Sequence, residues 1–232
     1  MDTVGVIGLG AMGTPMAWNI DASEFDLAVY NRTTEREVEF AEAGVTVTDS
    51  PRHLTELADA VIVMVTDGDA VMEVLERRLG VLAGLDESAD TTVIQMSTIS
   101  RAETLTAAEA VREAGGRYVD APVFGTVDPA EEGTLSIFPS GDRDVVEEVW
   151  GVFEILGDSI IYAGETGQGT NLKLTVNLLL GNMMGAFAEA LTFGVGHGLS
   201  PADVLDAIES GPVHAPLFGV KGASILDREF DP

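Results

Sequence analysis

Residues Thr3–Ile20, TVGVIGLGAMGTPMAWNI, decide how the rest of the chain is interpreted. The apolar run Thr3–Ile7 predicts a buried strand and Thr14–Ile20 predicts a helix, with three glycines between them in the spacing G-x-G-x-x-G. These glycines allow a tight turn, close approach of the backbone to a pyrophosphate, and close packing of helix on strand, while the helix N-terminus supplies N–H donors. A glycine-rich turn without a ligand is the alternative. The predicted dinucleotide-binding loop comprises Gly8, Leu9, Gly10, Ala11, Met12 and Gly13.

Strand and helix patterns alternate from here to about residue 164, which predicts an α/β fold with a doubly wound parallel sheet of Rossmann type. After Gly164 no strand pattern appears, and the long apolar stretch Asn171–His197 predicts a helix. We therefore expect a dinucleotide-binding domain over residues 1–164 and an all-α domain over residues 165–232. The expected strands are Thr3–Ile7, Leu27–Tyr30, Val45–Val47, Ala60–Val65, Thr91–Met96, Arg117–Val119, Leu135–Phe138 and Ile160–Tyr162, with one helix over Asp144–Leu156 before the last strand.

The residues after the second predicted strand indicate which dinucleotide is preferred. A carboxylate at this point usually binds the ribose hydroxyls of NAD, but this chain has Asn31, Arg32 and Thr33. Arginine can pair with a 2′-phosphate, so we expect NADP as the cofactor, with NAD possible. An arginine on a solvated turn is the alternative. The residues Met64, Val65 and Thr66, at the end of another strand, are also expected beside the cofactor.

The composition limits the classes of partner. There are 39 acidic residues against 12 basic ones, a formal net charge of -27, which disfavours binding to nucleic acid or an anionic membrane. Such a surface is expected of a cytoplasmic protein from a salt-loving organism; an ordinary acidic enzyme is the alternative. The sequence contains no Cys, and its three His show no metal-ligand spacing, so no metal site is expected. We also expect no apolar run of the ~18 residues that a spanning helix needs, and no signal peptide.

A lysine stands in the predicted interdomain helix. Lys173 lies within QGTNLKLTVN, residues 168–177, among Leu, Thr, Val and Asn. Desolvating an ammonium is costly and lowers its pKa toward the range useful for proton transfer. Asn177, four residues later, would share its face of the helix. A lysine that reaches solvent from a core helix is the alternative.

Four segments together resemble the β-hydroxyacid dehydrogenase family, which includes 3-hydroxyisobutyrate dehydrogenase, tartronate semialdehyde reductase and, more distantly, 6-phosphogluconate dehydrogenase. They match family motifs in order over nearly the whole chain. The four segments are GVIGLGAMGTPMAWNI (5–20), QMSTIS (95–100), DAPVFGTVDPAEEGTL (120–135) and GQGTNLKLTVN (167–177).

The resemblance implies an NADP-dependent oxidoreductase acting on a small 3-hydroxy acid or semialdehyde acid. Lys173 would be the general acid/base and Asn177 would orient the substrate. Backbone groups of Gly125 and Thr126, in the segment that begins with Phe124, would bind the substrate carboxylate, and Thr98 would contact the nicotinamide or its ribose. Family members also suggest a homodimer or higher homo-oligomer formed through the helical domain.

Two departures from the family pattern matter. Phe124-Gly125-Thr126 stands where Ser-Gly-Gly is usual, so the substrate is expected to be more apolar, unless Phe124 turns into the core. Family members also continue past a segment like Asp227–Pro232 into helices that carry a second lysine. A non-catalytic NADPH-binding or assembly protein is therefore the main alternative. An imine reductase is less favoured, because relatives of that kind usually replace the lysine that is present here.

Overall fold

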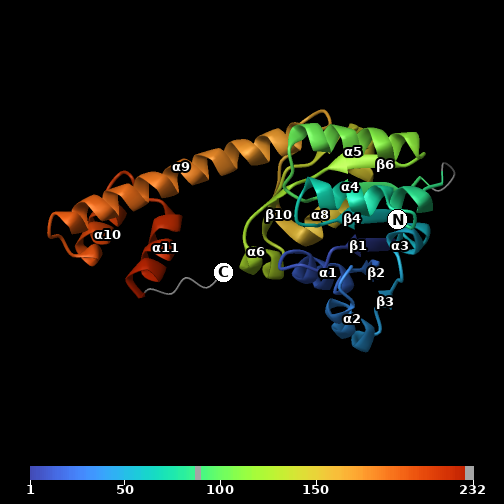
Figure 1. Cartoon of the computed structure of the whole chain (residues 1–232), viewed down its shortest axis with the longest axis horizontal. Coiled ribbons are helices and arrows are strands. Elements are labelled where there is room, and N and C mark those ends of the chain that lie inside the picture. The colour runs from blue at the N-terminus through green and yellow to red at the C-terminus, as the bar shows by residue number, and fades with distance from the viewer. Residues whose placement is uncertain (87–89, 228–232) are drawn as a thin grey trace. The chain divides into compact units, whose positions relative to one another are not determined.

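The fold is described from a computed structural model, in which residues 1–86 and 90–227 are described. The chain divides into two compact units, Met1–Leu174 and Thr175–Pro232. The first unit is an α/β domain and the second is helical (Figure 1). The predicted fold class is therefore confirmed.

The first unit is built on a seven-stranded sheet with the strand order β3-β2-β1-β4-β5-β6-β9. Every neighbouring pair in this sheet is parallel except β6 and β9. The inner strands are nearly continuous apolar runs because both faces of a parallel sheet are covered. The strands of this sheet are β1 (Thr3–Ile7), β2 (Asp26–Tyr30), β3 (Thr46–Val47), β4 (Ala60–Val63), β5 (Thr92–Gln95), β6 (Arg117–Asp120) and β9 (Ser140–Gly141).

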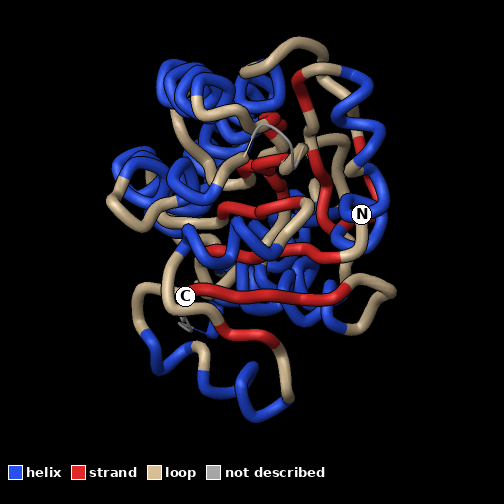
Figure 2. The backbone as a smooth tube through the Cα atoms, turned by 90° about the vertical axis from the view of Figure 1, so that its right-hand side faces the viewer, coloured by secondary structure: helices blue, strands red, loops and turns tan. Residues whose placement is uncertain are grey.

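Alternate residues of these strands pack into two separate cores. Ile62 and its counterparts in neighbouring strands pack with α1 and α8, whereas Val61 and its counterparts pack with α3, α4 and α5. Figures 1 and 2 show the strands between these two helical layers. The helices of the first unit are α1 (Gly13–Asp21), α2 (Val38–Ala43), α3 (Pro51–Leu57), α4 (Gly68–Glu76), α5 (Arg101–Glu113), α6 (Val127–Glu132), α7 (Arg143–Glu148) and α8 (Trp150–Leu156), with 3-10 turns η1 (Thr34–Arg36) and η2 (Val81–Gly84).

The later strands differ from the prediction of one parallel sheet. A separate three-stranded sheet has the order β10-β8-β7, formed by β7 (Val123–Phe124), β8 (Leu135–Ile137) and β10 (Gly157–Ile160). The chain leaves the main sheet at Pro122, whose ring nitrogen cannot donate to a strand ladder. The last strand, predicted over Ile160–Tyr162, is β10 and lies earlier in the chain, over Gly157–Ile160. The single helix predicted over Asp144–Leu156 is divided into α7 and α8 at Val149.

The second unit contains the later part of α9 (Gln168–Gly196), together with α10 (Pro201–Glu209) and α11 (Pro216–Asp227). Its small core is centred on Phe187 and Phe218, whose rings stack 4.8 Å apart, with Leu205 beside them. Ser200 caps α10 by accepting a hydrogen bond from the backbone N–H of Asp203, at 3.1 Å.

The expectation that no segment is long and apolar enough to span a membrane was wrong for α9. This helix has 29 residues, and an 18-residue window in it has a mean hydropathy of 1.4. Polar residues and glycines, such as Asn182, Gly185 and Glu189, divide the sequence of α9 into short apolar runs, so no uninterrupted run indicates the length of the helix. By length and composition alone α9 could cross a membrane, and the core helices of soluble proteins pass the same test.

Candidate active site and cofactor cleft

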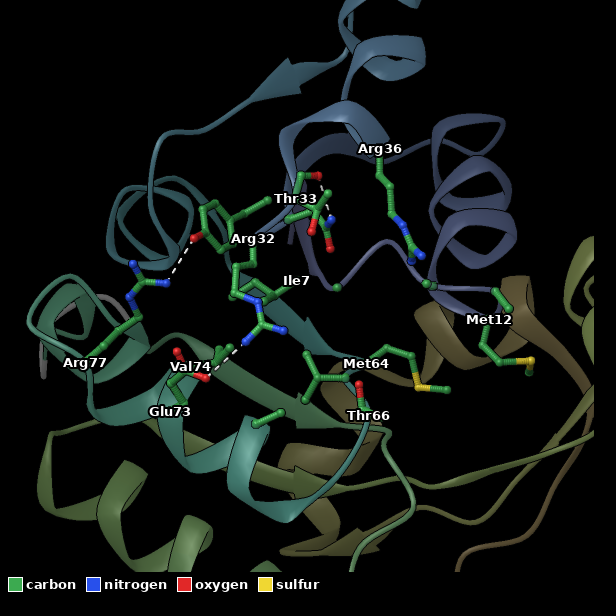
Figure 3. A pocket seen from close by; sticks show the side chains of 18 residues that line it. Ile7, Met12, Arg32, Thr33, Arg36, Met64, Thr66, Glu73, Val74 and Arg77 are labelled. Carbon is green, nitrogen blue, oxygen red and sulfur yellow. Dashed lines mark hydrogen bonds and ion pairs between the residues drawn. The ribbon is translucent and has the colours of Figure 1, made fainter.

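A cavity of about 400 Å³ opens where β1, β2 and β4 end at their carboxyl edge (Figure 3). Ligands of open α/β sheets bind at this edge. The cavity includes every residue predicted to bind the cofactor except Leu9 and Thr98. Its lining is Ile7, Gly8, Gly10, Ala11, Met12, Gly13, Tyr30, Asn31, Arg32, Thr33, Arg36, Met64, Val65, Thr66, Ala70, Glu73, Val74 and Arg77.

The glycine loop has the shape that a pyrophosphate requires. Gly8 has a φ of +102°, and a Cβ on Gly13 would overlap the carbonyl oxygen of Gly8. A Cβ on Gly10 would have no neighbour closer than 3.7 Å, so space lies above this residue. The helix α1 then begins with no capping side chain and no acidic residue in its first turn. Its free N–H donors and positive dipole end therefore suit an anion.

Asn31 holds this loop in place, in addition to lining the cavity. Its Oδ1 accepts from the backbone N–H of Leu9 at 3.0 Å, and its Nδ2 donates to the carbonyl of Thr33 at 2.8 Å. The Leu9 side chain is fully buried in the core. Leu9 thus contributes to the loop through its backbone, which explains its absence from the cavity wall.

Three arginines, Arg32, Arg36 and Arg77, are among the residues that line the cavity. Arg32 lies 3.4 Å from the carboxylate of Glu73, Arg36 donates to the carbonyl of Leu9 at 2.9 Å, and Arg77 donates to the hydroxyl of Tyr30 at 3.0 Å. Figure 3 shows each of these guanidinium groups directed at its own partner, with Arg32 between Arg77 and Arg36. This charge fits the 2′-phosphate of NADP.

Sequence reasoning identified Arg32 but missed Arg36 and Arg77. Arg77 follows α4 and is 47 positions from its partner Tyr30, so no local pattern indicates it. Thr98, which was predicted to contact the nicotinamide or its ribose, is exposed in the loop after β5. Its neighbour Ser97 accepts from the backbone N–H of Val65 at 2.9 Å, which ties the two loops together.

Lys173 occupies the second turn of α9, and the whole residue is only 7% exposed. Its side-chain nitrogen lies 4.7 Å from the centre of the Phe124 ring. Burial lowers the pKa of Lys173 below that of a free lysine, because it penalises the charged form. The ring face favours the charged form and partly opposes this effect.

The predicted substrate segment is placed in the same unit. Phe124 turns toward Lys173 and is only half-buried, while Gly125 and Thr126 are exposed where the chain enters α6. Asn177 is half-buried four residues beyond Lys173 on α9, within the second unit. The ammonium of Lys173, with its lowered pKa and the apolar ring beside it, is suited to exchange a proton with a small substrate.

Two family models together match nearly the whole chain. The NAD binding domain of 6-phosphogluconate dehydrogenase matches residues 3–164. The NAD-binding domain of NADP-dependent 3-hydroxyisobutyrate dehydrogenase matches residues 167–232.

Individual relatives agree with the family models. Glyoxylate/succinic semialdehyde reductase 1 of Arabidopsis thaliana is 36% identical over 99% of this chain and 78% of its own length. The 2-hydroxy-3-oxopropionate reductase of Escherichia coli is 37% identical over 99% of this chain and 77% of its own length. The structure of Mycobacterium tuberculosis 3-hydroxyisobutyrate dehydrogenase with L-serine aligns with a TM-score of 0.84 and 29% identity, covering 93% of this chain and 72% of that one. The chain therefore belongs to the β-hydroxyacid dehydrogenase family.

Proposed function

We propose that this chain is an NADP-dependent oxidoreductase that acts on a small 3-hydroxy acid or the matching semialdehyde acid, with NAD as a possible second cofactor. Relatives named as semialdehyde reductases support this reaction class. The observation that carries the proposal is the buried ammonium of Lys173 beside Phe124, in the same unit as the glycine-loop cleft.

The chemistry divides between cofactor and protein. When bound, the nicotinamide supplies or accepts the hydride. Lys173 donates a proton to the carbonyl oxygen during reduction and takes it back during oxidation, and its lowered pKa brings it closer to the working pH. Backbone N–H groups at Gly125 and Thr126 bind the substrate carboxylate, and Asn177 orients the substrate.

Phe124 narrows the class of substrate. Its ring lies beside the side-chain nitrogen of Lys173. A phenyl ring has no polar atom that could form a hydrogen bond with a hydroxyl group of the substrate. We therefore infer that the substrate carries hydrogen or an alkyl group, in preference to a hydroxymethyl group, on the side that faces Phe124. An imine substrate is disfavoured, since Lys173 is retained.

The test is a panel of short 3-hydroxy acids and semialdehydes with NADP(H), assayed in molar potassium chloride beside Lys173→Ala. We expect turnover by the wild type, loss of turnover in the variant, and cofactor binding in both. Turnover that survives Lys173→Ala would contradict the assignment of the proton donor. A folded wild type that binds NADPH but turns over no substrate would favour the non-catalytic binding protein.

We also propose a cytoplasmic, salt-adapted homodimer that has no nucleic-acid or membrane partner. The charge of -27 favours hydration in concentrated salt, where repulsion between like charges is screened. On α9, Leu178, Leu179 and Phe193 are 68%, 60% and 69% exposed, and burying these side chains against a second copy of the chain would be favourable. Light scattering across a potassium chloride series tests the dimer and the salt adaptation. We expect a dimer that persists in molar potassium chloride. A monomer at every salt concentration would contradict the proposed dimer.

A further inference from the structure

A fully buried carboxylate lies at the end of β6, outside the cofactor cleft. Asp120 has no solvent exposure, and three hydrogen bonds reach its two oxygens. The backbone N–H of Thr170 donates at 2.9 Å, the hydroxyl of Thr170 at 2.8 Å and the hydroxyl of Ser140 at 2.9 Å. A buried charge persists only when such partners compensate for its lost hydration.

These hydrogen bonds secure the first turn of α9. The first N–H groups of a helix have no partner within the helix, and a carboxylate at this end also interacts favourably with the helix dipole. Asp120 accepts from Thr170, and Ser140 accepts from the backbone N–H of Gly169 at 2.9 Å. The cap therefore comes from a distant strand of the sheet and not from the residue that precedes the helix.

Close packing and a chain of hydroxyls strengthen this attachment. A Cβ on Gly169 would overlap the carbonyl oxygen of Phe138, so the helix start lies directly against the backbone of the sheet domain. The hydroxyl of Thr170 also lies 2.9 Å from that of Thr104 on α5. Because Thr170 donates its own proton to Asp120, Thr104 is the donor between these two hydroxyls. The start of α9 is thus attached to β6, to β9 through Ser140, and to α5.

Asp120 is linked to both members of the lysine–phenylalanine pair, to Lys173 through its hydrogen bonds to Thr170 and to Phe124 through the short segment between them. Thr170, which it holds, is one helical turn before Lys173, and Phe124 follows Asp120 by four residues. We propose that Asp120 is a positioning residue, which fixes the side-chain nitrogen of Lys173 against Phe124 and hence against the substrate. This inference rests on the proposed function, in which Lys173 transfers the proton.

The chemistry of the site explains why aspartate is required. Donors converge on the carboxyl from Thr170, Ser140 and the backbone of Gly167, and only a carboxylate has two oxygens that both accept. Burial nevertheless raises the pKa of Asp120, because desolvation outweighs these donors. Burial and the charge of Asp120 raise the pKa of Tyr118 on the same strand, and Arg112 on α5 acts in the opposite direction on Tyr118. Asparagine would keep one accepting oxygen, and alanine would keep none.

The first experiment follows Lys173 without relying on turnover. Lys173 and Lys221 are the only lysines in the sequence, so protein labelled with 13C-lysine gives one resonance to follow and one internal reference. In the wild type we expect the Lys173 side chain to carry a ring-current shift from Phe124 and to titrate at a lower pH than a free lysine. Asp120→Ala should reduce both differences, and Asp120→Asn should restore most of each. An unchanged Lys173 resonance in folded Asp120→Ala would overturn the inference, whether or not any substrate is known.

The second experiment measures kcat and KM for the same variants on a substrate found in the panel. Misplacement of the proton donor should lower kcat about tenfold to a hundredfold in Asp120→Ala, with KM for NADPH within about twofold. Thr170→Val, which removes one hydroxyl and keeps the N–H, should give a smaller loss. The matched control is Thr55→Val, which removes another buried hydroxyl bond, 2.8 Å to the carbonyl of Pro51 on α3. It should lower the Tm and leave kcat unchanged.

The outcomes separate this inference from the proposed function. Turnover that survives Lys173→Ala refutes the proton donor, irrespective of Asp120. Loss of turnover in Lys173→Ala together with wild-type kcat in both Asp120 variants refutes the positioning role alone. If Asp120→Ala does not fold, Asp120→Asn and Thr170→Val decide the question: unchanged kcat and unchanged Lys173 resonance in both would overturn the inference.

Discussion

The side-chain nitrogen of Lys173 lies 4.7 Å from the centre of the Phe124 ring, and the lysine is almost wholly buried. Two opposing effects therefore act on the same ammonium. Burial lowers its pKa, and the electron-rich ring face stabilises its charged form. The balance between them sets how readily this group exchanges a proton.

Phe124→Leu should lower the pKa of Lys173 further, because leucine fills space without presenting a ring face to the ammonium. A cation–π contact is worth ~0.5–2 kcal/mol, so the limb of the pH–kcat profile that reports Lys173 should move down by roughly 0.4–1.5 pH units. Phe153→Leu, which alters a buried ring on α8 in the core, is the control and should lower stability without moving that limb. An upward movement in Phe124→Leu would contradict the assigned contact.

Lys173→Met should stabilise the fold at neutral pH while it abolishes activity. The pKa of Lys173 is lower in the folded than in the unfolded state, so below the folded pKa both states are protonated and only the folded state buries the charge. As the pH rises from the folded pKa toward ~10.4, the unfolded state binds more protons, and the wild type gains stability. The difference in unfolding free energy between variant and wild type should thus narrow at alkaline pH in denaturant titrations. Lys221→Met, which makes the same substitution at an exposed lysine, is the matched control.

Arg32 and Glu73 should have opposite effects on the choice of cofactor. The two side chains form an ion pair at 3.4 Å, so Glu73 competes with a 2′-phosphate for Arg32. Arg32→Ala should weaken NADPH binding roughly tenfold and leave NADH nearly unaffected, since a hydrogen bond to a charged group is lost. Glu73→Gln should tighten NADPH binding selectively. Fluorescence titrations with both cofactors test this, and equal effects on NADH and NADPH would place the phosphate elsewhere.

Gly10 and Gly13 form a matched pair that separates folding from cofactor binding. A methyl group at Gly13 would overlap the backbone of Gly8, so Gly13→Ala should lower the Tm as well as cofactor affinity. A methyl group at Gly10 has room within the protein but occupies the space expected for the pyrophosphate. Gly10→Ala should keep the wild-type Tm without cofactor and lose the rise in Tm that NADPH causes. A retained rise would show that the pyrophosphate does not approach Gly10.

The regular part of the fold could be predicted because its strands are long apolar runs. The predictions for β1, β2, β4 and β5 agree with the structure within two residues at each end. The strands β7 and β9 have two residues each and follow prolines or glycines, so they carry no periodic pattern. The three-stranded sheet was not predicted for the same reason, because β7, which pairs with β8 at one edge of that sheet, carries no such pattern.

The candidate site divides in a similar way. Motifs identified the glycine loop, Arg32 and Lys173, because each is a short contiguous signal. Arg36 and Arg77 act through partners on other elements, and Asp120 acts through a residue fifty positions later. A charged residue at the end of an apolar strand was the available signal for Asp120, and only the structure shows what it binds.

The distant cap of α9 has a consequence for recombining domains within this family. The match to the first family model ends at residue 164 and the match to the second begins at residue 167, which makes this segment an obvious crossover point for chimaeras. A junction there would take Asp120 and Ser140 from one parent and Gly169 and Thr170 from the other. Exchanges at this junction should succeed only between parents that share these four residues. The unit to transfer is therefore α9 together with the end of β6 and with β9, whose side chains bind the start of the helix.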